Sequence, residues 1–210
     1  SVLPYCGIPV WRSCNERQAF QLPAGPVFPL MVGMDISGLI ESLQSAIGDP
    51  STGLPKDVFL FASRITPMVN VDLLIRNEQR QTLLTWREDE YYGPGWHVPG
   101  GVVRFKEKIA TRIAAVAASE LGATVEYRKD PLAFNEVMNA KRDTRGHFIS
   151  LLYECTLTTP LDPSLEHKAG RVKHGEWAWH GSCPGKLISV HGMYSQFIGS
   201  FEVMPTVRNK

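Results

Sequence analysis

The chain has 210 residues, of which 43% are hydrophobic and 20% are charged. This length suits one domain with a sizeable core, and the composition excludes a wholly disordered chain. The formal net charge of +1 provides no overall field that would draw the protein to a nucleic acid or an anionic membrane, although a local patch is compatible with it.

Residues 1–33 differ from the rest of the chain. They contain five prolines, follow neither a helical nor a strand period, and lack the features of a secretory signal. The prolines exclude a membrane-spanning helix in the uncharged run between Arg17 and Asp35. Two interpretations are open: an extended arm lying on the domain, or a segment upstream of a functional start near Met31 or Met34.

An N-terminal helix and linker are expected over residues 34–53. The Asp35 carboxylate is suited to accept backbone N–H groups of a first turn, and apolar residues then follow helical spacing over residues 36–47. A Gly-Asp-Pro sequence stops this helix. Pro55 suits the first position of a second, short helix over residues 58–62.

From residue 68 the pattern becomes that of strands. Residues 68–75 and 81–86 are β-rich and flank a polar turn at 77–80, which predicts a hairpin. Further strands are expected at residues 96–98, 133–138, 148–156 and 176–179, and a last helix at residues 189–198. These elements predict an α/β (α+β) fold with helices packed on a mixed, curved sheet, in a domain of residues 54–200 followed by a tail at 201–210.

Residues 95–123 carry the clearest chemistry. Two glycines end a short strand and let the backbone approach a ligand closely, and an alanine-rich helix is expected over residues 107–121, ended by Gly122. If the helix folds against the glycine turn, the Glu120 carboxylate and the Gly100 carbonyl provide two hard oxygen ligands for Mg²⁺. Taken alone this pattern is weak, since a single glutamate on a helix is usually solvated.

The same stretch resembles a Nudix box, in which a glycine, five residues, a glutamate, seven residues and Arg-Glu-aliphatic-any-Glu-Glu-any-Gly-aliphatic follow one another. The chain supplies Gly101, Glu107, Glu120 and Gly122 at the required spacing. Three positions depart from the box, because Ala115 replaces an arginine and Val116 and Ser119 replace glutamates.

The flanking segments are similar to those of the GDP-mannose mannosyl hydrolase branch of the Nudix superfamily, over about residues 54–198. The matching segments are TPMVNVD at 66–72, LLTWR at 83–87, GWHVPGG at 95–101 and VKHGEWAW at 172–179. The resemblance implies an α/β/α sandwich with a loop–helix–loop catalytic motif. It also implies Mg²⁺-dependent (alternatively Mn²⁺-dependent) hydrolysis of a nucleotide sugar such as GDP-mannose, with water attacking the anomeric carbon and the nucleoside diphosphate leaving.

The resemblance also implies roles for individual residues. Gly100 and Glu120 would hold the metal. Arg87 would stabilise the departing diphosphate, Asp72 would orient the substrate, and His174 would be the general base, a role that histidine side chains commonly have. The alternatives are an exposed strand-end arginine, an aspartate on the wet face of a strand, and an ordinary loop histidine.

The departures from the branch weaken this site. Val102 and Ala115 stand where the branch has arginines, so two phosphate contacts are lost. Lys173 stands where a glutamine completes the metal shell; an ammonium group cannot ligate Mg²⁺, so Lys173 is expected to contact a phosphate instead. Arg104 is a further candidate for binding substrate.

Two other basic features remain. Glu107 loses its usual arginine partner, and Arg104 or Arg112 is expected to replace it. The loop at 139–147 either recovers phosphate contacts or is a solvated hairpin tip. Its basic residues are Lys141, Arg142, Arg145 and His147.

Three functions are therefore weighed: a nucleotide-sugar hydrolase, a binding protein of the same fold that has lost catalysis, and a Nudix pyrophosphatase that attacks phosphorus. The third needs more carboxylates than Glu120 offers. The resemblance favours a homodimer with residues 1–53 at its interface. Four cysteines without a C-x-x-C pair argue against a zinc ribbon, indicate a reduced, cytoplasmic protein, and disfavour a Cys6–Cys14 disulfide.

Overall fold

The structure, a computed structural model, describes residues 35–199 of the chain. The expectations for the arm at residues 1–33, for its cysteines and for the tail at 201–210 lie outside the described residues. The chain divides into two units, residues 1–42 and 43–210. The sheets and the candidate site belong to the second unit.

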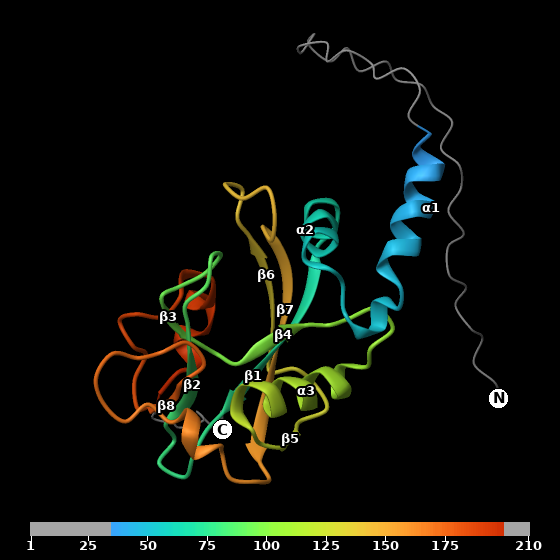
Figure 1. Cartoon of the computed structure of the whole chain (residues 1–210). Coiled ribbons are helices and arrows are strands. Elements are labelled where there is room, and N and C mark those ends of the chain that lie inside the picture. The colour runs from blue at the N-terminus through green and yellow to red at the C-terminus, as the bar shows by residue number, and fades with distance from the viewer. Residues whose placement is uncertain (1–34, 200–210) are drawn as a thin grey trace, which may run out of the picture. The chain divides into compact units, whose positions relative to one another are not determined.

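Within the part of the chain that the structure describes, two α-helices precede the first strand (Figure 1). Helix α1 (Ile36–Ile47) has the predicted bounds, and the Asp35 carboxylate caps it by accepting N–H groups of its first turn. Helix α2 (Lys56–Ile65) is longer than predicted. Pro55 lies just before α2, at the position that caps it, and is not its first helical residue as expected.

The larger sheet has five strands and is mixed. Strand β1 (Met68–Ile75) pairs in parallel with β7 (His147–Leu157) along one edge and antiparallel with β4 (Gly100–Val102) along the other. The free edge of β7 is shared by β6 (Ala133–Met138) and β5 (Val125–Tyr127), both antiparallel. The predicted mixed α+β class is confirmed, whereas β4 and β5 were not predicted. Strand β4 contains two glycines, which are rare in strands, and β5 is too short to show alternation.

The smaller sheet has three antiparallel strands in the order β3 (Gly95–His97), β2 (Thr82–Arg87) and β8 (Trp177–His180). The predicted hairpin between residues 68–75 and 81–86 is wrong. Both strands and the turn form, but β1 and β2 meet only at a bridge between Arg76 and Thr82. The physical reason is that β4 and β7 already occupy both edges of β1.

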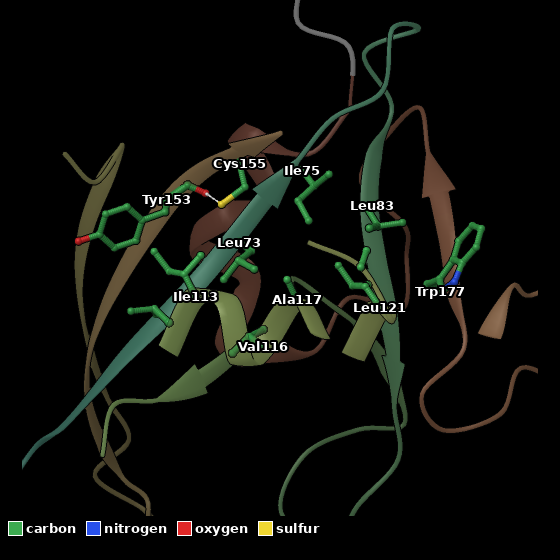
Figure 2. Packing of buried hydrophobic residues seen from close by; sticks show 12 residues of the cluster. Leu73, Ile75, Leu83, Ile113, Val116, Ala117, Leu121, Tyr153, Cys155 and Trp177 are labelled. Carbon is green, nitrogen blue, oxygen red and sulfur yellow. Dashed lines mark hydrogen bonds between the residues drawn. The ribbon is translucent and has the colours of Figure 1, made fainter. Parts of the chain in front are cut away.

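Helix α3 (Ile109–Leu121) packs against β1 and β4. It starts two residues later than predicted and ends as predicted, with Gly122 in the left-handed conformation at φ 61°. Figure 2 shows its apolar side chains beneath Leu73 and Ile75 of β1. The buried residues of α3 are Ile113, Val116, Ala117 and Leu121, one face of a helix.

Strand β1 is buried on both faces. Val71, Leu73 and Ile75 belong to the cluster with α3, whereas Leu74 belongs to a second cluster with Tyr194. Tyr194 lies in the segment Ser189–Phe197, where the predicted last helix forms as a 3-10 helix. None of the helices within residues 35–199 has both the length and the apolarity needed to cross a bilayer.

Candidate functional site

A cavity of about 190 Å³ lies on the face of the larger sheet that is opposite to α3. Asn70 of β1, Ser150 of β7 and Gly100 of β4 line it from the sheet, because these residues share one face by strand register. Arg87, from the end of β2, and His191 also line it. The cavity therefore collects residues from both sheets and from the 3-10 helix.

The Glu120 carboxylate reaches the glycine turn, as the metal-site prediction requires. Its Oε1 accepts a hydrogen bond from the Gly100 N–H at 3.3 Å. Its Oε2 accepts one from the Thr85 hydroxyl at 3.0 Å and lies 3.4 Å from His97 Nε2. The side chain is 26% exposed. The C-terminal end of α3 thus bridges the two sheets at Gly100.

Gly100 itself is required by close packing. A Cβ atom at this position would lie 2.1 Å from Asp72 Oδ1, so no larger residue fits. The Leu73 N–H donates a hydrogen bond to the Pro99 carbonyl, just before β4. Because hydrogen-bonded and non-hydrogen-bonded positions alternate in an antiparallel pair, the N–H and C=O of the following residue, Gly100, point away from β1. The Gly100 carbonyl therefore lies on the edge of β4 that its N–H shares with Glu120.

These residues fit a magnesium ion that takes most of its ligands from water and phosphate. One carboxylate and one main-chain carbonyl are hard oxygen donors, and Mg²⁺ commonly uses such a small protein set. Among the described residues no group of three or more His, Cys, Asp or Glu side chains forms a closed metal cage. Glu107 is not available as a ligand, because it pairs with Arg112 at 2.8 Å. Arg112 is therefore the predicted substitute partner, and Arg104 contributes only its backbone N–H.

Asp72 lies behind the cavity wall rather than in it. The side chain is 1% exposed, and it accepts hydrogen bonds from Asn70 Nδ2 at 2.7 Å and from the Tyr194 hydroxyl at 2.6 Å. Burial raises the pKa of Asp72 to about 7. Burial also lowers the pKa of His191, whose Nε2 is 4.0 Å from Asp72 Oδ1. The expectation of a wet-face aspartate is therefore wrong, and a direct contact between Asp72 and substrate is not what this arrangement provides.

The buried Asp72 carboxyl predicts a pH-dependent stability. Its pKa is higher in the folded chain, at about 7, than in an unfolded chain, at 3.8, so the folded state binds the proton more tightly. This stabilisation is complete below pH ~4 and is lost as the pH rises through ~7, a change of roughly 4 kcal/mol. We expect Asp72→Asn, which mimics the protonated acid, to remove this slope.

Urea unfolding of the wild type and of Asp72→Asn between pH 5 and pH 8 measures the effect, because the pKa of about 7 lies within this range. The exposed Asp130→Asn is the matched control and should keep the wild-type slope. Parallel pH profiles for the wild type and Asp72→Asn would contradict the assignment. The lowered pKa of His191 has the opposite effect, since it destabilises the fold as the pH falls below ~6.5.

Arg87 lies where its predicted role needs it, in the cavity wall. Its Nε donates to the Asp89 carboxylate, and its guanidinium lies 5.2 Å from the centre of the Tyr92 ring. Asp89 also accepts the backbone N–H groups of Tyr91 and Tyr92. Asp89 therefore holds the loop after β2 together, and its contact with Arg87 fixes the position of the Arg87 side chain in the cavity wall.

The other predicted substrate contacts lie elsewhere. His174 and Lys173 are exposed and do not line the cavity, and His174 Nδ1 accepts the Glu88 N–H at 3.1 Å. Arg104 lines a separate cavity of about 300 Å³ together with Phe59. The structure therefore does not bring Arg104 together with Arg87.

Several site residues were not predicted. His97 and Thr85 contact Glu120, and His191 and Tyr194 surround Asp72. His191 and Tyr194 lie in a segment that contains other polar residues, and Thr85 shares its strand with Thr82 and Arg87, so no local pattern in the sequence singles these residues out. The basic loop is also more than a solvated tip. Lys141 is exposed and His147 pairs with Glu136, but Arg142 and Arg145 turn inward onto Tyr91 and Tyr92.

No family model matches the chain. It is similar to the Low-salt glycan biosynthesis protein Agl8 of Haloferax volcanii, with 33% identity over 127 residues that cover 59% of this chain and 81% of the relative. Solved structures with a similar fold include the MutT protein from Methanosarcina mazei Go1, with 21% identity over 55% of this chain and 78% of that chain and a TM-score of 0.43. Another is a MutT Nudix hydrolase from Burkholderia pseudomallei, with 21% identity over 58% and 90% and a TM-score of 0.45. On the identity and coverage of the curated relative, the chain belongs to the family of the Low-salt glycan biosynthesis protein Agl8.

Proposed function

We propose that this protein is a Nudix-type hydrolase that cleaves a nucleotide sugar, such as GDP-mannose, to the free sugar and a nucleoside diphosphate, with Mg²⁺ or alternatively Mn²⁺ as cofactor. The observation that carries the proposal is the hydrogen bond between the Glu120 carboxylate and Gly100, which together with Arg87 lines the cavity. Hard oxygen donors together with a guanidinium suit a ligand that contains a diphosphate.

The name of the relative is consistent with this substrate class. Agl8 is named for glycan biosynthesis at low salt. Glycan biosynthesis depends on activated sugars, and many of these carry their sugar on a diphosphate. A hydrolase of nucleotide sugars in this family would act on the activated donors themselves.

The residues divide the work as follows. Glu120 and the Gly100 carbonyl would hold the ion, which, when bound, neutralises diphosphate oxygens and so improves the leaving group. Arg87 binds the diphosphate from the cavity wall, and its permanently charged, planar group stabilises the charge that develops as the nucleoside diphosphate leaves. Gly100 allows the backbone to approach the ligand, because it has no Cβ.

His174 is the general base in this proposal, and its hydrogen bonding sets a condition. Because Nδ1 accepts the Glu88 N–H, the neutral ring carries its proton on Nε2. Base action at Nδ1 therefore requires that the bond to Glu88 break. Lys173 is exposed and next to His174 in sequence, and it is proposed as a phosphate contact. This contact likewise requires the segment to release Glu88 and move toward the substrate.

A second candidate function is nucleotide-sugar binding without turnover. It is favoured by the ion pair between Glu107 and Arg112, because this pair removes Glu107 as a metal ligand. The Nudix box then offers the metal the Glu120 carboxylate at the Gly100 turn, which is a small set of charged ligands. The exposure of His174 outside the cavity lining points the same way.

Incubation of the full chain with a panel of nucleotide sugars, with Mg²⁺ or with EDTA, separates the candidates. We expect free sugar and nucleoside diphosphate with Mg²⁺ and neither product with EDTA. Tight binding without product would favour the binding protein, and sugar phosphate with nucleoside monophosphate would favour attack at phosphorus. Neither binding nor product across the panel would contradict the proposal.

A further inference from the structure

Three arginines surround two tyrosine rings beside the cavity, and we call this group the arginine–tyrosine cluster: Arg87, Arg142, Arg145, Tyr91 and Tyr92. The Arg145 guanidinium carbon lies 4.7 Å from the ring centre of Tyr91 and 5.3 Å from that of Tyr92. The guanidinium carbons of Arg142 and Arg87 lie 4.5 Å and 5.2 Å from the centre of Tyr92. The rings hold the three cations close together through cation–π contacts.

The charges in the cluster are not balanced. Arg87 is paired with Asp89, and Arg142 donates Nη2 to the Tyr91 carbonyl at 2.5 Å. Throughout residues 35–199, no hydrogen bond or ion pair ends on the Arg145 guanidinium, and its Nε is buried without a partner. Desolvation and the nearby Arg87 lower the pKa of Arg145. A half-buried cation of this kind is unfavourable unless an anion arrives to satisfy it.

The backbone of Arg145 is held in place from two sides. Its N–H donates to the Ser63 hydroxyl of α2 at 3.0 Å, and its carbonyl accepts the Tyr92 hydroxyl at 3.0 Å. The residue has a φ of 52°, which a side-chain-bearing residue rarely adopts. Next to it, Gly146 accepts the Asn139 N–H at 2.7 Å and closes the hairpin. The side chain is therefore aimed by contacts from separate segments and not left to a free loop tip.

Arg145 and Arg87 line the same cavity as Gly100. We infer that Arg145, acting with Arg87, binds the diphosphate group of the substrate, and this inference rests on the proposed function. Two guanidiniums from different loops provide the paired, charge-assisted hydrogen bonds that diphosphate oxygens accept. Arg145 adds a guanidinium to a site in which positions 102 and 115 are Val102 and Ala115. The loop at 139–147 thus supplies a specificity-determining residue from outside the Nudix box.

Calorimetric titration of the full chain with inorganic pyrophosphate, in EDTA and in Mg²⁺, tests this inference without requiring turnover. We expect the wild type to bind pyrophosphate more tightly than inorganic phosphate, because two guanidiniums contact it. Arg145→Ala should weaken pyrophosphate binding by about 10- to 100-fold, as expected for the loss of charge-assisted hydrogen bonds. Arg145→Lys keeps the charge but loses the planar guanidinium, so its affinity for pyrophosphate should lie between those of the wild type and Arg145→Ala.

Arg128→Ala is the matched control, because it removes an exposed arginine near the other end of β7. It should bind pyrophosphate like the wild type. Thermal unfolding should show that Arg145→Ala folds, since an unpaired cation is removed. If Arg145→Ala does not fold, Arg145→Gln keeps most of the stem packed on the rings and carries the same expectation.

The inference is overturned if the wild type does not bind pyrophosphate, or if the Arg145 variants bind it as tightly as Arg128→Ala. Its failure is distinct from failure of the proposed function. If the wild type and Arg145→Ala hydrolyse nucleotide sugars equally well, the proposed function stands and the role of Arg145 is refuted. A wild type that binds pyrophosphate through Arg145 but releases no product would keep the anion site and remove the hydrolase.

Discussion

Replacement of Glu120 by glutamine is expected to lower kcat/KM for the nucleotide sugar by about 1,000-fold, or ~4 kcal/mol of transition-state stabilisation. Glu120 is the carboxylate that meets the Gly100 turn, so its loss removes the charged ligand for the metal. Glutamine is isosteric and still offers a carbonyl oxygen to the Gly100 N–H, so the fold should be retained. Turnover measured across a range of Mg²⁺ concentrations, together with thermal unfolding, checks both expectations.

Glu126→Gln is the control for this substitution. Glu126 is exposed on β5, and its loss removes the same charge away from the cavity. Its activity should equal that of the wild type. Wild-type kcat/KM in Glu120→Gln at every Mg²⁺ concentration would contradict the metal site, and equal losses in both variants would indicate an effect of net charge alone.

Gly100→Ala is expected to destabilise the protein by about 3 kcal/mol or more and to abolish activity. The added Cβ would lie 2.1 Å from Asp72 Oδ1 and 2.8 Å from the Val71 carbonyl. Neither atom can move freely, because Val71 belongs to β1 and Asp72 is held by Tyr194. Overpacking of this kind forces the backbone to shift. Chemical denaturation gives the free energy of unfolding.

Gly185→Ala is the matched control, since no atom lies within 4 Å of a Cβ at that position. The same change of residue should there leave stability within ~0.5 kcal/mol of the wild type, as is usual for open surface sites. If Gly100→Ala unfolded like Gly185→Ala, the close approach of β4 to Asp72 would not exist in solution.

Much of the fold could be predicted from local pattern, but strand pairing could not. Helix α3 follows from its alanine content, its apolar spacing and the stop at Gly122, and β1 follows from its β-rich composition. The partners of β1 are β4 and β7, whose paired residues lie about 30 and 80 positions further along the sequence. A local turn between β1 and β2 therefore suggested a hairpin that long-range pairing replaces.

The candidate site was predictable where a spacing rule applies and not where distant segments meet. The resemblance to a Nudix box, based on Gly101, Glu107 and Glu120, implies that the helix meets the glycine turn, and the contact between Glu120 and the Gly100 N–H agrees with this. The burial of Asp72 could not be predicted, because it depends on Tyr194, 122 residues further along the chain. The inward turn of Arg145 likewise depends on Ser63, 82 residues before it.

The most direct test of the account is hydrolysis of the best nucleotide sugar in ¹⁸O-labelled water with Mg²⁺, followed by mass spectrometry of both products. The account predicts that the label enters the free sugar and that the nucleoside diphosphate stays unlabelled, because water attacks the anomeric carbon. Label in a phosphate group, or a complete lack of products from every nucleotide sugar, would contradict it.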